Sequence, residues 1–284
     1  MISQYYRLVK PGIVRGNLIV ALAGFLFASR GEVNILSMIY MLLGLGCVIA
    51  SSCVVNNYLD REIDRKMKRT EKRALVTGEI SDRKALALAV MLGLVGVLIL
   101  FFLVNSLAAR IAIAGFLFYV VVYGYWKRRS VFGTLVGSIS GAVPPVVGYV
   151  AVTNALDIAS LLLFLVLVFW QMPHFYSIGI YSFSDYKKAS IPILPVEKGM
   201  DLTKKHIKIY MWGFVISTFM FTLFGYTGII YLIVMLCTGG AWLYKAYVSE
   251  GHGSDELWAK KMFSFSLVVL LVFCLMISLD FILP

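Results

Sequence analysis

The chain has 284 residues, of which 60% are hydrophobic and 14% are charged, and its mean hydropathy is +0.86. A water-soluble domain of this length cannot bury so much apolar surface, so the composition excludes a soluble enzyme and indicates an integral membrane protein. The net charge of +11 is explained by membrane topology and attraction to an anionic leaflet, and it indicates no nucleic-acid partner.

Runs of about twenty apolar residues, the length that a helix needs to cross a bilayer, recur along the whole chain. They predict an all-α, polytopic membrane protein with about nine transmembrane helices, forming a single transmembrane domain over residues 1–284. The expected spans are 13–29, 35–56, 85–104, 107–125, 132–152, 158–178, 209–225, 227–247 and 262–282.

The basic residues predict the orientation of these helices, because lysine and arginine are retained on the cytoplasmic side in short loops. With the N-terminus placed in the cytoplasm, all of the 26 lysines and arginines except Arg30 and Arg110 fall on the inner side. The chain is therefore expected to run N-in and C-out.

Two inner connections are much longer than the others, at about 57–84 and 179–208. They follow the second and the sixth expected span, which suggests two four-helix halves, helices 1–4 and 5–8, followed by a ninth helix. Long loops on one face of a rigid scaffold commonly carry function, and membrane proteins often place their sites between such repeats. The chemistry is therefore expected at the inner face.

The first long connection begins with NNYLDREIDRKMKRTEKR, residues 56–73. Asn56, Asp60 and Asp64 are four residues apart and would form one stripe on a helix that continues the second span. Such carboxylates repel one another unless a cation lies between them, and oxygen ligands suit Mg²⁺, which completes its shell with phosphate oxygens. The bases nearby therefore favour a diphosphate site. The competing interpretation is a solvated segment whose acids pair with neighbouring bases. The bases near this stripe, to which both interpretations refer, are Arg61, Arg65, Lys66, Lys68, Arg69 and Arg73.

The second long connection lies within WQMPHFYSIGIYSFSDYKKASIPILP, residues 170–195. Tyr181 and Asp185 are four residues apart and would share a helical face. His174 lies deeper in the span, where an ionisable side chain is a candidate for function. The alternative is a histidine bonded to a backbone carbonyl at the Pro173 kink. A lipidic diphosphate fits both connections, with its head at the metal and its tail among the helices.

The segments NNYLDREIDRKMKRT and RALVTGEIS resemble the first aspartate-rich motif of the UbiA-type intramembrane prenyltransferases. Within that superfamily, WKRRSVFGTLVGSISGAVPPVVGY (126–149) and WQMPHFYSIGIYSFSDYKKASIPILPV (170–196) are similar to the family that farnesylates haem. The match runs from about Lys10 to the C-terminus. It implies helices around a central cavity in a bacterial inner membrane. It also implies Mg²⁺-dependent transfer from farnesyl diphosphate to a vinyl group of haem b, with addition of water.

Carried over residue by residue, the resemblance implies that Asp60, Asp64 and Asp185 are catalytic and that, together with Asn56, they hold Mg²⁺. It also implies a set of diphosphate-binding residues. That set is Asn56, Arg61, Arg69, Arg73, Lys127 and Arg128.

The second motif departs from the wider superfamily, where several aspartates recur. Here it offers His174, Tyr181 and a single carboxylate, Asp185. We therefore hypothesise that His174 and Tyr181 contact the haem, with His174 as a ligand of the iron.

Other functions stay open on the sequence alone. A related prenyltransferase acting on an aromatic quinone precursor would share the first motif, but it would carry several aspartates in the second loop. A transporter would place ionisable groups in the middle of several spans, whereas the charges here lie at the inner ends. Proteins that deliver haem or assemble a terminal oxidase are partners that only the resemblance implies.

Overall fold

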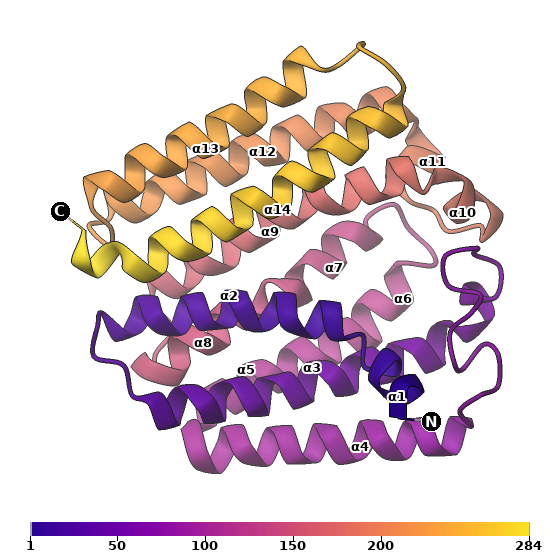
Figure 1. The fold of residues 1–284 in the computed structure, drawn as a ribbon, viewed down its shortest axis with the longest axis horizontal. Coiled ribbons are helices and arrows are strands. Elements are labelled where there is room, and N and C mark those ends of the chain that lie inside the picture. The colour runs from indigo at the N-terminus through magenta and orange to yellow at the C-terminus, as the bar shows by residue number, and fades with distance from the viewer. Residues whose placement is uncertain (1, 284) are drawn as a thin grey trace.

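The computed structural model describes residues 2–283, which form helices joined by short connections (Figure 1). Within this range nine helices are long and apolar enough to cross a membrane, as expected. In chain order they are Pro11–Ser29 (α2), Ile35–Asp64 (α3), Asp82–Val104, Ser106–Trp126, Gly133–Thr153, Ile158–Tyr181 (α9), Met200–Leu223 (α12), Ile229–Val248 (α13) and Asp255–Ile282.

Four of these spans consist of more than one segment. They combine α4 (Asp82–Ile99) with η1 (Leu100–Val104), α5 (Ser106–Leu117) with η2 (Phe118–Tyr123) and α6 (Gly124–Trp126), α7 (Gly133–Gly141) with α8 (Val143–Thr153), and α14 (Asp255–Leu279) with η3 (Asp280–Ile282). The first two η segments are π-helical. Three short helices lie outside the spans: α1 (Ile2–Leu8), α10 (Phe183–Lys188) and α11 (Leu194–Lys198).

The helices run side by side, and their connections gather at two ends (Figure 1). We call one of them the basic end: it holds α1, α10, α11 and the connections 65–81, 127–132, 182–199 and 249–254. The C-terminal helix finishes at the opposite end. The described chain thus starts at the basic end with α1 and finishes at the opposite end. This requires an odd number of crossings, in agreement with nine spans.

Several helices extend further at the basic end than hydropathy predicts. Helix α3 continues from the expected limit at residue 56 to Asp64, and α12 begins at Met200 rather than at residue 209. A hydropathy window marks the part of a helix that lies in hydrocarbon, whereas helical hydrogen bonding can continue into charged sequence. The two long connections are consequently shorter than expected, at 65–81 and 182–199.

The fifth span is interrupted at Ala142, between α7 and α8. Pro144 and Pro145 lie in the first turn of α8, where the missing N–H groups have no partner within the helix to lose. The break in the span therefore comes directly before this proline pair.

Helix α2 packs very closely on α8, and glycine permits the approach. A Cβ added to Gly24 would lie 2.1 Å from the carbonyl oxygen of Pro145, and one added to Gly148 would lie 1.9 Å from that of Ala21. Small residues at such crossings let helix backbones meet in membranes, where lipid is as apolar as leucine. This contact closes one wall of the helix bundle.

Candidate functional site

A cavity of about 660 Å³ opens toward the basic end of the bundle. Its charged and amide-bearing side chains come from the ends of helices and from the connections between them, whereas its deeper wall is apolar and includes Leu45, Val48 and Leu167. The cavity therefore has a polar head and an apolar body. The charged and amide side chains of the polar head are Lys10, Asn56, Asp60, Asp64, Arg69, Arg73, Lys127 and Arg128.

The acidic stripe on α3 faces this polar head, and each of its members is bonded to a base. Oδ2 of Asp60 accepts a hydrogen bond from Nζ of Lys127 at 2.5 Å, and Oδ1 accepts one from Nη2 of Arg128 at 3.0 Å. Oδ2 of Asp64 accepts from Nη1 of Arg73 at 2.5 Å. The predicted stripe is therefore one continuous helical face, and these two aspartates line a single cavity.

The third member of the stripe, Asn56, is bonded to a residue that lies outside the sequence motifs. Oδ1 of Asn56 accepts a hydrogen bond from Nζ of Lys10 at 2.9 Å. Burial lowers the pKa of Lys10 to about 8, and the positive charge of Arg73 adds to that shift. The sequence alone does not predict that Lys10 belongs to the site. Its left-handed backbone, at φ 52°, turns it from the start of α2 toward α3.

Positive charge exceeds negative charge in the polar head. Lys10, Arg69, Arg73, Lys127 and Arg128 face the two aspartates of the stripe. Burial also lowers the pKa of Lys127, although the charge of the neighbouring Asp60 opposes that shift. Ammonium groups held in a low-dielectric site are stabilised by a further anion, so this end of the cavity is suited to a polyanionic ligand.

The oxygen ligands of the stripe fit a magnesium ion that shares its shell with a phosphate. Among the described residues there is no cluster of three or more His, Cys, Asp or Glu able to hold a metal alone. Mg²⁺ is commonly held by one or two carboxylates together with substrate phosphates and water. Asp60, Asp64 and the carbonyl of Asn56 provide that kind of incomplete set.

Three of the predicted site residues do not line the cavity. Arg61 points away from it, with Nη1 2.6 Å from Oδ2 of Asp82 and its guanidinium over the ring of Tyr58. Oδ2 of Asp185 accepts a hydrogen bond from the backbone N–H of Arg69 at 3.4 Å, and it thereby joins α10 to the connection 65–81.

Tyr181 packs its ring edge-on against Phe263, at 5.6 Å between centroids. Tyr186, five residues further along, lines the cavity in its stead. Burial raises the pKa of Tyr186, and the positive charge of Arg69 opposes the shift. Sequence spacing does not favour Tyr186, because its position depends on the short helix α10.

His174 lines the cavity, and its hydrogen bonds define its tautomer. Nδ1 lies 2.8 Å from Oγ of Ser266, whose own proton is donated to the carbonyl oxygen of Phe263 at 2.6 Å. Ser266 can then only accept, so Nδ1 carries the proton and Nε2 keeps a free lone pair. The carbonyl of Pro173 accepts from Ser177 instead, so the proposed bond from histidine to a carbonyl at this kink is absent.

The ring of His174 is held between two aromatic rings. It stacks on Trp170 at 4.9 Å between centroids and contacts Phe263 at 4.6 Å. Nε1 of Trp170 donates to the backbone carbonyl of Ser266 at 2.7 Å, so α9 and α14 are joined on both sides of the imidazole. A histidine fixed in this way has one lone pair and little rotational freedom.

A pair of tyrosines covers another wall of the cavity. Tyr119 and Tyr123 lie on the π-helical segment η2 and stack at 5.4 Å between centroids. Nζ of Lys127 lies 5.0 Å above the ring of Tyr123. The aromatic faces therefore begin directly beside the polar head, and π-helical turns of this kind occur frequently at functional sites.

Gln171 is a buried polar residue of the apolar body. Its Nε2 donates to the carbonyl oxygens of Ser138 and Leu167, at 3.1 and 2.9 Å. A Cβ added to Gly141 would lie 2.0 Å from Oε1 of Gln171, so the glycine makes room for the amide. Both residues lie within the segments that carry the family resemblance, but their spacing in the sequence does not single out either of them.

Comparison with known proteins places this geometry in context. The family model described as the UbiA prenyltransferase family matches residues 17–271. A protoheme IX farnesyltransferase of Sodalis glossinidius is 48% identical over 288 residues, covering 100% of this chain and 96% of the relative. One from Cronobacter sakazakii is 47% identical over 285 residues, covering 100% of this chain and 97% of the relative.

Solved structures share the fold at low sequence identity. A digeranylgeranylglyceryl phosphate synthase superposes with a TM-score of 0.81 at 20% identity, covering 99% of this chain and 98% of that one. A UbiA homologue from Archaeoglobus fulgidus, bound to GPP and Mg²⁺, gives a TM-score of 0.65 at 17% identity, covering 97% of this chain and 99% of that one. At these identities the likeness concerns the arrangement of helices.

Proposed function

The chain belongs to the UbiA prenyltransferase family, and from this premise we propose that it transfers the farnesyl group of farnesyl diphosphate to a vinyl group of protohaem IX. Water adds in the same reaction, and the product is haem O. The full-length relatives at 47% and 48% identity are named for protohaem IX farnesylation, which supports this acceptor over a quinone precursor.

One observation supports this activity most strongly: the cavity combines a surplus of bases around two carboxylates with an apolar body behind them. A diphosphate fits the polar head, and an isoprenoid chain fits the apolar body. A transporter site would need ionisable groups at the midplane of several spans. Here the charges that line the cavity lie at its polar head.

The diphosphate is held by the bases of the polar head. Lys127, Arg128 and Arg73 already contact carboxylates at 2.5 to 3.0 Å, so they are positioned to accept phosphate oxygens as well. When bound at Asn56, Asp60 and Asp64, Mg²⁺ supplies Lewis-acid stabilisation of the leaving diphosphate. The bases stabilise the same developing charge in a site with little water.

Ionisation of the carbon–oxygen bond leaves an allylic farnesyl cation and free diphosphate. The faces of Tyr119 and Tyr123 lie beside the polar head, where they stabilise this cation and exclude water from it. The terminal vinyl carbon of the haem forms a bond to the cation. The new cation lies on the carbon next to the macrocycle, and water adds there with loss of a proton.

His174 is proposed as the haem contact in this cavity. Its Nε2 lone pair is free because Nδ1 donates to Ser266, and stacking on Trp170 keeps the ring in place. Imidazole nitrogen in this tautomer is a ligand for haem iron. Tyr181, which packs on the same Phe263 as His174, is proposed to support this contact from behind.

The haem contact can be tested separately from the reaction. The His174→Ala variant should bind haem b with a shifted Soret band, and a Ser266→Ala variant should show a smaller shift. Wild-type spectra in both variants would exclude His174 as an iron ligand.

Asp185 is also part of the proposal. It is proposed to act at the rim of the site, through the connection 65–81, which it joins at Arg69.

The basic end is proposed to face the cytoplasm of a bacterial inner membrane, because nearly all lysines and arginines lie there. Partner proteins that deliver haem or assemble a terminal oxidase would then meet the enzyme at that membrane.

The activity is tested by incubating purified enzyme with haem b, farnesyl diphosphate and Mg²⁺, with a quinone precursor as competitor. Formation of the hydroxyethylfarnesyl adduct of haem supports the proposal. Farnesylation of the quinone precursor alone would support the sister activity instead. Chelation of divalent cations should stop turnover, and added Mg²⁺ should restore it.

A further inference from the structure

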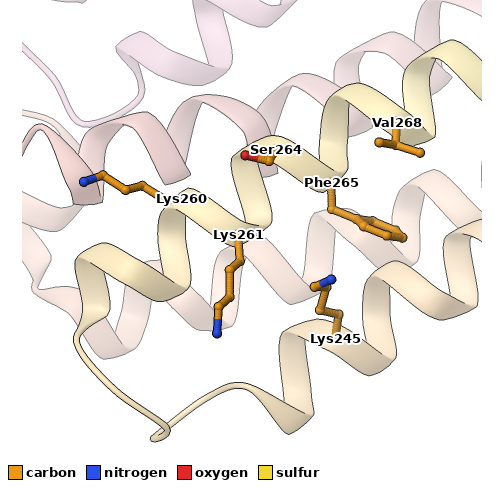
Figure 2. A pocket seen from close by; sticks show the side chains of 6 residues that line it. All are labelled: Lys245, Lys260, Lys261, Ser264, Phe265 and Val268. Carbon is orange, nitrogen blue, oxygen red and sulfur yellow. The ribbon is translucent and has the colours of Figure 1, made fainter.

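A second pocket lies on the outside of the bundle, in the groove between α13 and α14 at the basic end (Figure 2). Its volume is about 340 Å³, and it shares no residue with the central cavity. It therefore takes no part in the prenyl transfer described above. The pocket is lined by Lys245, Lys260, Lys261, Ser264, Phe265 and Val268.

Three carboxylates at this corner are already paired with lysines other than Lys245 and Lys261. Asp255 pairs with Lys204 at 2.5 Å, and Glu250 pairs with Lys208 at 2.7 Å. A third carboxylate, Glu256, pairs with Lys260 at 2.6 Å. The acidic groups at this corner thus have counter-charges outside the groove or at its edge.

Two lysines of the groove are left without a counter-charge. No salt bridge between described residues 2–283 includes Lys245 or Lys261. Figure 2 shows them on the two facing helices, with Lys260 directed away from both. Nζ of Lys245 lies 5.0 Å from the ring centroid of Phe265. The groove consequently presents two positive charges above an apolar floor.

The apolar floor continues along α14 toward the opposite end of the bundle. Val268, Leu271 and Leu275 are three or four residues apart and share one helical face, and all three are exposed on the surface. This face begins with Lys261 and Ser264 at the basic end. It therefore passes from charged to apolar in the direction in which a lipid passes from headgroup to acyl chain.

We propose that this groove binds an anionic phospholipid, with its phosphate at Lys245 and Lys261 and one acyl chain along Val268, Leu271 and Leu275. Basic pockets between transmembrane helices at the membrane surface are suited to lipid phosphates. The bound lipid holds the ends of α13 and α14 together at a corner where two like charges face each other. The inference does not depend on which prenyl acceptor the enzyme uses.

The test compares lipid retention by native mass spectrometry after purification in phosphatidylglycerol or in phosphatidylcholine with the same acyl chains. Wild-type enzyme should retain phosphatidylglycerol in preference. The Lys245→Gln/Lys261→Gln variant should lose that preference by about tenfold or more, and Lys245→Arg/Lys261→Arg should keep it. The matched control is Lys84→Gln/Lys198→Gln, which removes two exposed lysines elsewhere at the basic end and should behave as wild type.

Two further arms make the outcome decisive. Inorganic phosphate at the same concentration should not displace the lipid, because it lacks the acyl chain; displacement would identify a free-phosphate site and overturn the proposal. Farnesyl transfer by the double glutamine variant reports on its folding. If an active double variant retained phosphatidylglycerol as wild type does, or if wild type did not discriminate between the two lipids, the lysines would serve topology alone.

Discussion

Asp60 and Lys127 form a 2.5 Å ion pair that joins the end of α3 to the turn after α6, and both side chains are 13% exposed. The same carboxylate also accepts a hydrogen bond from Arg128. Removing one partner of a buried pair leaves the other charge without compensation. A substitution at Asp60 or Lys127 can therefore affect both the stability of the polar head and its binding of the diphosphate.

Replacing Asp60 or Asp64 by Asn should lower turnover by about a hundredfold or more, because each change replaces a charged carboxylate proposed to hold the metal by a neutral amide. The measurement is kcat with haem b and farnesyl diphosphate at saturating Mg²⁺. The control is Asp82→Asn, since Asp82 pairs with Arg61 away from the cavity. Near-normal turnover in Asp60→Asn would remove the stripe from the mechanism.

Arg61 and Lys127 should respond differently to truncation, although the sequence suggested the same role for both. Lys127→Ala should raise the KM for farnesyl diphosphate about tenfold or more, because a charge-assisted contact to phosphate is lost. Arg61→Ala should leave KM within about twofold of wild type, since its guanidinium is bound to Asp82 and Tyr58 outside the cavity. Equal effects of the two substitutions would show that Arg61 turns toward the substrate.

The affinity for farnesyl diphosphate should fall as pH rises through about 8, because the buried ammonium of Lys10 loses its proton there. The sign is fixed by the lowered pKa: Lys10 is charged below about 8 and neutral above it in the folded protein. Without substrate, the cost of burying this charge is present below about 8 and disappears toward 10.5, the value in the unfolded chain.

The matched variant for this pH dependence is Lys10→Arg, which keeps its charge over the whole range. Its KM profile should be flat between pH 7 and about 9. A wild-type profile that matched the arginine variant would show that Lys10 does not contact the diphosphate.

Gly148→Ala should destabilise the protein by about 1–3 kcal/mol, because its Cβ would lie 1.9 Å from a backbone oxygen of α2 that cannot move independently of its helix. Thermal unfolding in detergent measures the effect. Gly240→Ala is the control, because a Cβ there meets nothing within 4 Å, and it should be neutral or slightly stabilising. Equal melting temperatures for the two variants would contradict the close contact of α2 with α8.

Much of the fold could be predicted because lipid imposes a simple rule on sequence: each crossing needs about twenty apolar residues. The stripe of Asn56, Asp60 and Asp64 could likewise be predicted, because its spacing is a property of one helix. Lys10 and Tyr186 could not, since a left-handed residue and a short helix place them. Helix periodicity alone could not show that Arg61 turns toward Asp82.

The tautomer of His174 illustrates a second limit of sequence reasoning. Its free Nε2 follows from Ser266, which lies 92 residues away on α14 and donates its only proton to Phe263. No local pattern connects positions so far apart. The sequence could place an ionisable group at this depth in the membrane, but only the packing of α9 on α14 shows which nitrogen is available.

The mass of the haem extracted after a single incubation of purified enzyme with haem b, farnesyl diphosphate and Mg²⁺ tests the proposed activity most directly. The structure and the relatives predict one new haem species, heavier by one farnesyl group and one hydroxyl group, and predict its loss in Asp60→Asn. Unchanged haem b, with farnesyl transferred to another acceptor or with diphosphate released by hydrolysis alone, would contradict the central claim.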